Sequence, residues 1–306
     1  MRSVAVAVGA GAAALAAAVA TRGGRTRLPR LPLRTLCGAN ATKEVIDPPP
    51  PKKIKVALCQ LAVTDDKQRN IATARTAIDE AAGAGADLVV LPEMWNCPYS
   101  NDSFPTYAEE VGGSIPERCD GRLYNTCFVY GRDGRLLGRH RKVHLFDIDI
   151  PGKITFKESL TLTPGEGLTV VDTEVGRLGI GICYDIRFPE MAQLYAARGV
   201  QLIVYPGAFN MTTGPAHWEL LQKARAVDNQ LFVATCSPAR SEGPGYIAWG
   251  HSTAVGPFAE ILGTADEKAG IVYCEMDFGQ LAERRANMPL RHQKRSDLYA
   301  LMDLTR

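Results

Sequence analysis

The stretch that decides the fold is "IKVALCQLAVTDDKQRNIATARTAIDEAAGAGADLVVLPE", which runs from Ile54 to Glu93. Residues 54–61 form a short, mostly apolar run of the kind found in buried strands. Residues 67–85 are rich in alanine at helical spacing and end in glycines, which commonly stop helices. Residues 87–93 contain a second short apolar run. Strand, helix and strand in this order predict a βαβ unit in a sheet that is buried on both faces.

The remaining sequence continues this alternation of strands and helices. Residues 122–131 and 135–146 read as two strands joined by "RDG", which is a hairpin signal. Further strands are expected around Leu168, Leu178 and Leu202 and at 231–236, 252–257, 259–265 and 270–277, with helices at 189–199, 214–230 and 278–289. Strands that alternate with helices and are interrupted by hairpins predict an α/β fold with mixed sheets.

Composition limits the class of protein. The 306 residues are 46% hydrophobic and 22% charged, which is ordinary for a globular chain. Residues 1–43 contain seven basic and no acidic residues, so residues 44–306 contain 28 basic and 33 acidic residues and a net charge of −5. This mildly acidic body has no electrostatic footprint for nucleic acid.

The cysteines and histidines show no metal-binding pattern. No two of the eight cysteines form a C-x-x-C pair, and the five histidines have no zinc-type spacing with them. His140 and His144 are four residues apart, but no cluster of further ligands follows them. The chain is also too long and too poor in cysteine for a disulfide scaffold, so we expect reduced thiols.

The first fifty residues have the composition of a targeting segment. Residues 4–20 are mostly alanine, valine and glycine, and an arginine-rich stretch without acidic residues follows. Together they predict a transit peptide for a mitochondrion or chloroplast, with a secretory signal, a signal anchor or a cytoplasmic location as alternatives. The proline run in 47–53 predicts a stiff linker. We therefore expect a transit peptide and linker over 1–50, one folded domain over 51–306, and no membrane association of the mature form.

Three chemically active side chains stand where apolar strands end. Glu93 closes "VVLPE", Lys142 lies in "GRHRKVHLF", and Cys183 closes "GIGIC". Taken singly, each is more often a cap, a solvated lysine or a core cysteine. Together they have complementary roles, because a thiol attacks, a carboxylate moves its proton, and an ammonium stabilises an oxyanion. The rim of an α/β sheet is also where such folds bind ligands.

The residues around these three positions resemble the nitrilase superfamily of carbon–nitrogen hydrolases. The superfamily has a Glu–Lys–Cys triad in the settings "LPE", "HRK" and "GICYDIRFPE", and the similarity covers residues 53–288. Within the superfamily, the chain is most similar to the omega-amidases, also called 2-oxoacid amidases. The stretches that carry this similarity are "GGSIPER", "LFDIDIPGKITFKES", "YPGAFNMTTGPAHWELLQKARAVDNQ" and "GYIAWGHS".

The resemblance implies a fold and a reaction. The expected fold is a four-layer αββα sandwich that forms a homodimer. The expected reaction is hydrolysis of the terminal amide of 2-oxoglutaramate or 2-oxosuccinamate through a thioester on the cysteine. No metal and no organic cofactor are implied. An amidase for deaminated glutathione is the alternative within the superfamily, and a non-catalytic or unstable product is the alternative outside this class.

The resemblance also assigns the site. It implies that Glu93 is the general base, Lys142 the oxyanion-stabilising residue and Cys183 the nucleophile, and that Glu158 in "TFKES" is a second glutamate that orients the catalytic group. Binding of the substrate is expected to involve Arg187 for the 2-oxo carboxylate, with Phe209, Met211, Thr213 and Tyr99 along the pocket.

One segment departs from the superfamily pattern. After "NDSFPTYAEE", which ends at Glu110, the chain continues directly into "VGGSIPER", where the superfamily has a helix and a strand. An average helix and strand together comprise roughly 17 residues. No helix candidate appears between Glu93 and the hairpin. A skipped exon in the gene model, a splice form and a tolerated shortening would each account for this gap.

Overall fold

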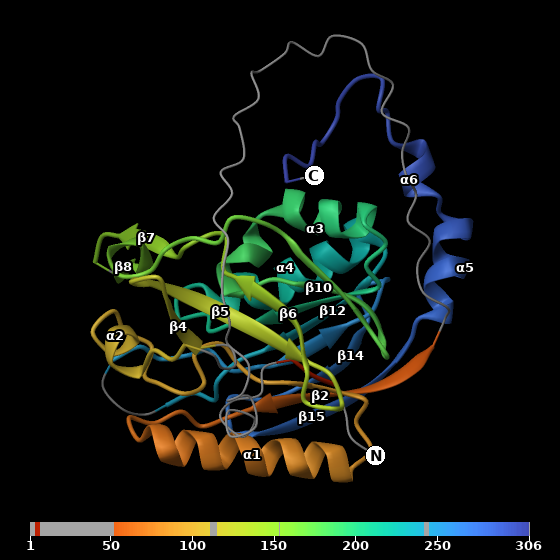
Figure 1. Cartoon of the computed structure of the whole chain (residues 1–306). Helices are drawn as coiled ribbons and strands as arrows, with labels where there is room; N and C mark the ends of the chain where they lie inside the picture. The colour runs from red at the N-terminus through yellow and green to blue at the C-terminus, as the bar shows by residue number, and fades with distance from the viewer. Residues whose placement is uncertain (1–3, 7–51, 111–114, 153, 242–244, 306) are drawn as a thin grey trace, which may run out of the picture.

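The computed structural model describes residues 4–6, 52–110, 115–152, 154–241 and 245–305. Two sheets are stacked face to face, with helices on the outer side of each (Figure 1). The described helices are α1 (Lys67–Gly83), α2 (Ser103–Tyr107), α3 (Pro189–Ala197), α4 (Gly214–Asn229), α5 (Gly279–Asn287) and α6 (Leu290–Gln293), with two 3-10 turns, η1 (Glu158–Leu160) and η2 (Cys183–Arg187). The four-layer α/β sandwich expected from the sequence is confirmed.

The first sheet has seven strands in the order β15-β2-β3-β1-β5-β4, with β6 paired to β5 on the opposite edge from β4. Strand β2 runs parallel to β3, as the βαβ prediction requires, and antiparallel to β15. The strands are β1 (Val4–Val6), β2 (Lys53–Gln60), β3 (Leu88–Val90), β4 (Ile115–Cys119), β5 (Arg122–Tyr130), β6 (Leu136–Arg141) and β15 (Gly270–Asp277).

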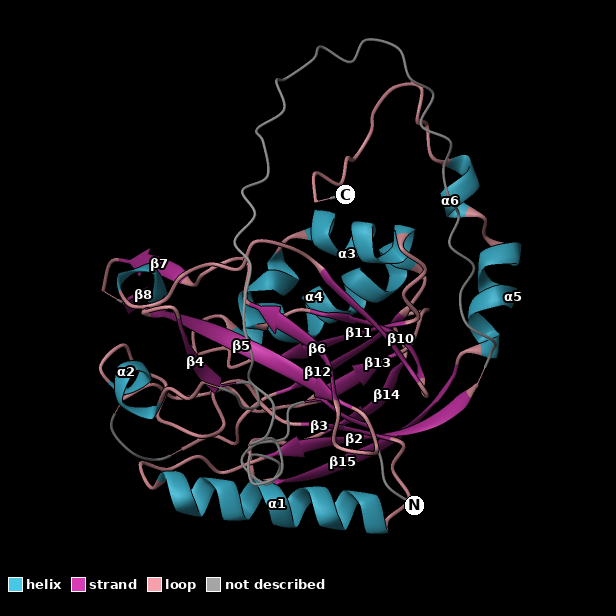
Figure 2. Cartoon of the chain, in the orientation of Figure 1, coloured by secondary structure: helices cyan, strands magenta, loops and turns pink. Residues whose placement is uncertain are grey.

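The second sheet has six strands in the order β14-β13-β12-β11-β10-β9. Its central strands β10, β11 and β12 are parallel, and α3 and α4 provide the crossover connections. A separate two-stranded hairpin of β7 and β8 lies at one end of the molecule (Figure 2). The strands are β7 (Asp147–Ile150), β8 (Ile154–Lys157), β9 (Thr169–Thr173), β10 (Gly176–Ile180), β11 (Leu202–Pro206), β12 (Phe232–Cys236), β13 (Thr253–Val255) and β14 (Ile261–Thr264).

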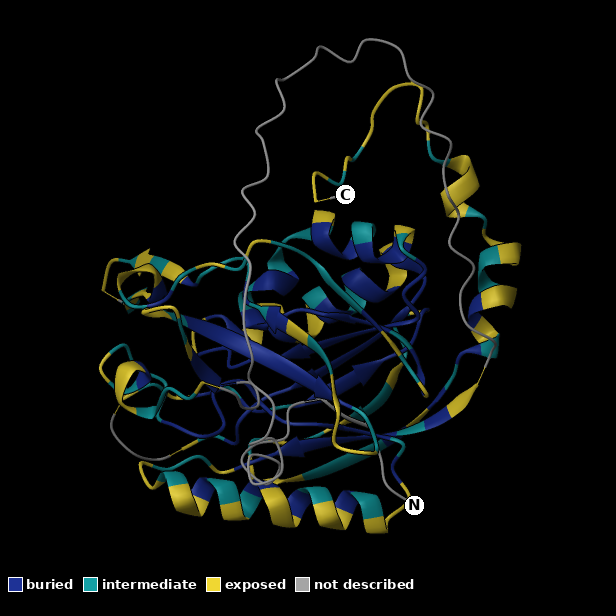
Figure 3. Ribbon diagram, viewed as in Figure 1, coloured by how far each residue is buried: buried dark blue, intermediate teal, exposed yellow. Residues whose placement is uncertain are grey.

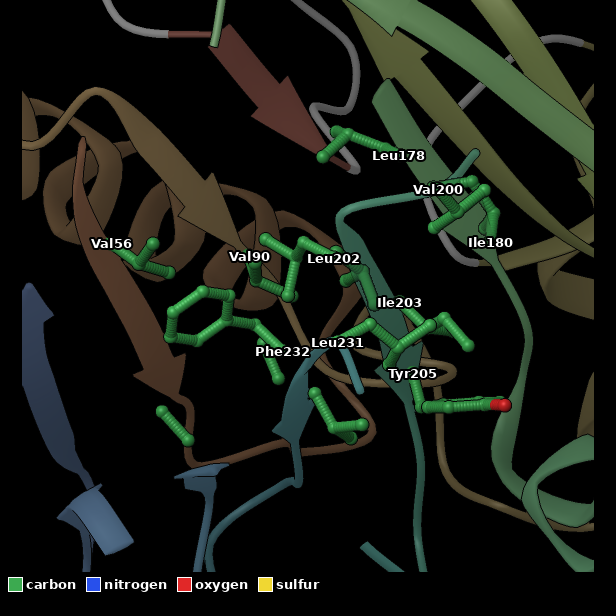
Figure 4. Packing of buried hydrophobic residues seen from close by; sticks show 14 of the residues in the cluster. Val56, Val90, Leu178, Ile180, Val200, Leu202, Ile203, Tyr205, Leu231 and Phe232 are labelled. Carbon is green, nitrogen blue, oxygen red and sulfur yellow. The ribbon is translucent and has the colours of Figure 1, made fainter. Parts of the chain in front are cut away.

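Alternation along each strand divides the core into layers. In β2, Val56 and Leu58 face the second sheet, whereas Ala57 and Cys59 face α1. The inter-sheet core is formed by aliphatic side chains of both sheets, such as Val90, and Figure 4 shows it. Each large apolar side chain fully buried there stabilises the fold by about 1.5–3 kcal/mol.

Helix α1 covers the outer face of the first sheet with small residues. Its alanines Ala74, Ala77 and Ala81 are buried against the sheet, and its opposite side is exposed (Figure 3). The Asp66 side chain caps its first turn by accepting a hydrogen bond from the Arg69 N–H at 3.0 Å. Small side chains let this helix pack closely on the sheet and therefore fix the strands below it.

The structure differs from the sequence predictions in the short elements. Helix α2 has five residues and lies between Glu93 and the hairpin, where no helix was expected. The sequence also did not predict the short elements β4, β7, β8 and α6. The sequence pattern missed them because elements of four or five residues are shorter than a clear period. No described helix has the length and apolarity that crossing a membrane would need.

The N-terminal prediction lies mostly outside the described residues. Of the expected transit peptide and linker over 1–50, only Val4–Val6 is described, and it forms β1 between β3 and β5 of the first sheet. Strand β2 begins at Lys53, directly after the proline run.

Candidate active site

Residues from four separate segments meet at one end of the two sheets. Glu93 follows β3, Lys142 follows β6 directly, Glu158 begins η1, and Cys183 begins η2. All four side chains are buried, with at most 4% of their surface exposed. The structure therefore brings together every residue that the sequence analysis assigned to the catalytic set.

Glu93 is the most heavily hydrogen-bonded member of this group. Its Oε1 atom accepts hydrogen bonds from Lys142 Nζ at 2.9 Å and from Asn125 Nδ2 at 2.7 Å. Its Oε2 atom accepts a hydrogen bond from the Ala208 N–H at 2.9 Å. Bonds on both oxygens fix the plane of the carboxylate, which is what a base that acts in one direction requires.

Lys142 lies between two carboxylates. Its Nζ is 2.9 Å from Glu93 Oε1 and 2.9 Å from Glu158 Oε2. Burial by itself lowers the pKa of Lys142, but Glu158 and Glu93 more than offset this and raise it above its usual range. Both carboxylates therefore favour the charged form of this side chain, in a site shielded from water.

Glu158 and Tyr99 both contact the Lys142 ammonium, in addition to Glu93. The Tyr99 hydroxyl donates to Glu158 Oε1 at 2.6 Å, and the Phe146 N–H donates to Glu158 Oε2 at 2.7 Å. Burial raises the pKa of Glu158, and the charge of Lys142 opposes that increase. Tyr99, expected to border the pocket, thus contacts three charged residues, including Glu93 at 3.2 Å and Lys142 at 3.4 Å.

Cys183 sits in a strained turn between strand and helix. Its φ is +45°, a conformation that is rare for a residue other than glycine. Strain of this kind recurs where a nucleophile is exposed at the top of a sheet. A Cβ on Gly207 would lie 3.3 Å from Cys183 Cα and 3.2 Å from the Trp218 ring, so glycine allows the end of β11 to approach the turn closely.

The electrostatic surroundings of Cys183 favour the thiol over the thiolate. Burial raises the pKa of Cys183 well above its usual value, and the negative charge of Glu93 raises it further. The charge of Lys142 and the Ala208 N–H act in the opposite direction. Attack by this sulfur would require removal of its proton, and Glu93 is the carboxylate that interacts with the thiol.

A second buried network, missed from the sequence, supports the turn at Cys183. Asp185 accepts hydrogen bonds from the Ile182 N–H at 2.9 Å and the His144 N–H at 2.9 Å, and it contacts His140 Nε2 at 3.1 Å and His144 Nδ1 at 2.8 Å. Burial by itself raises the pKa of Asp185, but bonds from both histidines lower it below its usual range. The network ties the Cys183 turn to the segment that carries Lys142.

Arg187 lies near the Cys183 sulfur and packs against Phe209. The Arg187 guanidinium stacks over the Phe209 ring at 4.6 Å, and its Nη1 contacts His217 Nδ1 at 3.1 Å. Within the described residues, the buried Nε of Arg187 has no hydrogen-bond partner. The Cys183 thiol is close enough to act on the pKa of Arg187, which burial lowers. An unpartnered donor beside Cys183 is available to an anionic ligand.

The other predicted pocket residues are placed less centrally. The Thr213 hydroxyl donates to Asn210 Oδ1 at 3.2 Å, which stabilises the turn before α4. Met211 is 42% exposed on that turn. No contact between either residue and the four buried catalytic candidates is found in the described structure, so their binding role stays a prediction.

Two further residues belong to the site by contact. Asn125 is fully buried in β5 and donates to Glu93, while its Oδ1 has no partner among the described residues. The Tyr246 ring stacks on Tyr99 at 4.5 Å, and its hydroxyl donates to the Ala208 carbonyl. The only sequence signal for Asn125 was that it is a polar residue inside the apolar run 122–131. Tyr246 was marked only by its place in the stretch "GYIAWGHS".

Comparisons with known proteins agree on one family. A family model described as carbon–nitrogen hydrolase matches residues 55–115 and 110–286. The chloroplastic omega-amidase of Arabidopsis thaliana is 60% identical over 283 residues, covering 84% of this chain and 77% of that protein. An omega-amidase of Bos taurus is 55% identical over 265 residues, covering 80% of this chain and 96% of that protein.

A solved structure shows the same architecture. Nit3 of Saccharomyces cerevisiae, described as a member of branch 10 of the nitrilase superfamily, has 42% sequence identity and a TM-score of 0.72. The match covers 79% of this chain and 97% of the yeast protein.

The comparisons also contain a gap. The bovine alignment has 265 positions. It includes 80% of the 306 residues of this chain, which is about 245 residues. About 20 aligned positions therefore have no residue in this chain. The family-model match is divided into two segments that meet at 110–115. This division coincides with the position after Glu110 where the sequence analysis expected a missing helix and strand.

Proposed function

The chain belongs to the carbon–nitrogen hydrolase family, and we propose that it is an omega-amidase that hydrolyses the terminal amide of 2-oxo acid amides such as 2-oxoglutaramate and 2-oxosuccinamate. The observation that carries this function is the 55–60% identity to omega-amidases over at least 80% of the chain. The alternative of a deaminated-glutathione amidase has no comparable support among these relatives. The products are the 2-oxo dicarboxylate and ammonia.

The first half of the proposed reaction forms a thioester. Glu93 takes the proton of the Cys183 thiol while the sulfur attacks the amide carbonyl carbon. The carbonyl oxygen becomes an oxyanion beside the Lys142 ammonium, and such stabilisation is commonly worth a few kcal/mol. Glu93 then gives its proton to the amide nitrogen, the carbon–nitrogen bond breaks, and ammonia leaves.

The second half releases the acid. A water molecule enters where the ammonia left and gives a proton to Glu93 as its oxygen attacks the thioester carbonyl. A second oxyanion forms beside Lys142 and collapses, and the carbon–sulfur bond breaks. The proton on Glu93 returns to the sulfur, so the resting thiol is regenerated. One carboxylate thus serves both halves as base and acid.

We assign positioning roles to Glu158 and Tyr99. Glu158 is 2.9 Å from Lys142 Nζ and receives the Tyr99 hydroxyl at 2.6 Å. These contacts support the proposal that the pair directs the ammonium towards the oxyanion. Their effect on the reaction is exerted through Lys142.

The 2-oxo carboxylate of the substrate requires a cationic partner. We propose Arg187, because its buried Nε has no partner among the described residues and its guanidinium lies against Phe209 near Cys183. The aromatic ring supports one face of the guanidinium and leaves its edge for the carboxylate. Phe209, Met211, Thr213 and Tyr99 remain the proposed lining of the pocket.

We further propose a homodimer and import into an organelle. The α4 helix exposes the apolar side chains of Leu220 and Val227, which suits an interface between helical layers. The Arabidopsis relative is chloroplastic by name, which supports the chloroplast over the mitochondrion as the destination. Light scattering of the purified chain and the location of a fluorescent fusion of residues 1–51 test these two proposals.

The test of the function is ammonia release by the purified chain. We expect turnover of 2-oxoglutaramate with a kcat/KM far above that for deaminated glutathione. Cys183→Ala is expected to abolish turnover, while Cys119→Ala, which changes a partly exposed thiol in β4, leaves it intact. A higher kcat/KM for deaminated glutathione, or turnover by Cys183→Ala, would overturn the proposal.

A further inference from the structure

Strand β1 lies inside the first sheet, far from β2 in sequence. Val4, Ala5 and Val6 pair in parallel with Leu88, Val89 and Val90 of β3. On the other side, Ala5 and Val6 pair antiparallel with Tyr130 and Val129 of β5. We call the space between Leu88–Val90 of β3 and Val129–Tyr130 of β5 the strand slot.

The strand slot lies along the same edge of β5 that pairs with β4. Strand β4 pairs antiparallel with β5, and its first residue, Ile115, is opposite Thr126. Extending this register upstream of Ile115 leads along the same edge of β5 to Val129 and Tyr130, which are the partners of β1. A chain with a longer strand before Ile115 would therefore fill the strand slot with that strand.

The chain lacks residues at this point. About 20 positions of the bovine alignment have no counterpart here, and the family-model match divides at 110–115. Val-Ala-Val contains two β-branched residues, which favour strands. Val4 and Val6 are in register with Leu88 and Val90, and Ala5 is in register with Val89.

An empty strand slot would be costly. Leu88, Val89, Val90 and Val129 are at most 1% exposed, and within the described sheet only β1 pairs with that edge of β3. Backbone N–H and C=O groups that are buried without partners destabilise a fold, and an open strand edge inside a protein invites pairing with another strand.

We propose that Val4–Val6 substitutes for the missing strand, so that the strand slot is an acceptor site for an extended apolar peptide and the leader is a structural part of this chain. Removal of the leader empties the strand slot and leaves it open to a peptide added in trans. The processed chain is then less stable than the full chain.

The strand slot is connected to the candidate active site. Strand β3 ends three residues before Glu93, and β5 carries Asn125, which donates to Glu93 at 2.7 Å. Lys142 follows β6, which is paired with β5. Because β1 is the strand that joins β3 to β5, loss of β1 is expected to loosen Glu93 relative to Lys142.

The experiment compares Ala5→Pro with Ala5→Val in the full chain. Proline removes the backbone donor at position 5 and cannot occupy a central strand, whereas valine favours strands and keeps the N–H. We expect Ala5→Pro to lower Tm by several degrees and to speed amide hydrogen exchange at Leu88–Val90 and Val129–Tyr130 at least tenfold. Ala5→Val should match the unchanged chain in both measurements.

Two further experiments test which segment fills the strand slot. A synthetic peptide with the sequence of residues 1–10 should restore slow exchange to a chain that begins at Lys52, whereas the same peptide with proline at position 5 should not. In a chain that carries the bovine segment inserted after Glu110, Ala5→Pro should have no effect on Tm or exchange. Unchanged exchange at β3 and β5 in Ala5→Pro overturns the proposal, even if the shortened chain fails to fold.

These readouts are independent of the proposed activity. Tm and hydrogen exchange report on the strand slot whether or not the protein hydrolyses amides. A chain with a filled strand slot and no turnover would contradict the omega-amidase function alone, and turnover with unchanged exchange in Ala5→Pro would contradict the strand proposal alone.

Discussion

Replacement of Glu93 by glutamine should separate the two effects of this carboxylate on Cys183. Glu93 is fully buried and accepts hydrogen bonds from Lys142, Asn125 and the Ala208 N–H. Glutamine preserves its size and removes its charge and its ability to carry the proton. Hydrolysis should therefore fall, while the bare nucleophilicity of the sulfur towards an alkylating agent should rise at neutral pH.

The size of each effect follows from simple electrostatics. General acid–base catalysis contributes about 10²–10⁴-fold, and Glu93 acts in both halves of the proposed reaction, so kcat/KM should fall by at least about 10³-fold. Two charges about 4 Å apart interact by about 4 kcal/mol at an effective dielectric constant of 20. Loss of the repulsion between Glu93 and the thiolate should lower the pKa of Cys183 in Glu93→Gln and move its alkylation profile to lower pH.

The assay measures the rate of Cys183 alkylation by iodoacetamide as a function of pH, with peptide mass spectrometry to isolate this cysteine from the others. Ammonia release is measured on the same preparations. Glu166→Gln, which changes an exposed carboxylate, is the matched control and should leave both curves unchanged.

A particular result would refute the electrostatic reasoning. If Glu93→Gln left the alkylation profile of Cys183 unmoved or shifted it to higher pH, the negative charge of Glu93 would not be what opposes thiolate formation. If the variant still released ammonia within tenfold of the unchanged chain, Glu93 would not be the base.

The remaining predictions concern the residues around this centre. Tyr99→Phe removes a hydrogen bond to a charged acceptor and should lower the free energy of unfolding by about 1.5–3 kcal/mol in denaturant titrations, whereas Tyr299→Phe at an exposed position should change nothing measurable. Arg187→Lys should raise KM for 2-oxoglutaramate about tenfold, corresponding to about 1.4 kcal/mol, and leave kcat within about threefold. An equal rise in KM for an amide substrate without a carboxylate would exclude the carboxylate contact. Asp185 has a lowered pKa in the folded state, so its stabilisation is present above the unfolded value of 3.8 and is lost as pH falls through the folded value. In thermal melts, Asp185→Asn should therefore be less stable than the unchanged chain at pH 7. This difference in Tm should shrink as the pH falls below about 4. A difference in Tm that is constant with pH would show that the carboxylate charge is not responsible.

Much of the fold was predictable because its elements have clear local periods. The βαβ unit of β2, α1 and β3 was visible as two apolar runs flanking a helical pattern, and α3 and α4 were expected at nearly their observed bounds. The short elements α2 and β4 were not, since their residues satisfy no period and are ordered by neighbours elsewhere in the chain.

The candidate site divides in the same way. Glu93, Lys142 and Cys183 could be selected from the sequence because each follows an apolar or alternating run and because their flanking motifs resemble one superfamily. Tyr99 was expected only at the border of the pocket, yet its hydroxyl contacts Glu158, which is 59 residues away. Asp185 was visible two residues after Cys183, but its contact with His140, 45 residues away, was not.

The sequence by itself determined the family, the alternation of strands and helices, the three chemically active residues and the gap after Glu110, because each of these is written in residues that are close together in the chain. Only the tertiary structure decided which buried partners surround Lys142, how Asp185 connects the nucleophile turn to β6, and that Val4–Val6 pairs with β3 and β5. These contacts join segments that are far apart in sequence, and they depend on strand register and on the burial of charge, which no local pattern specifies.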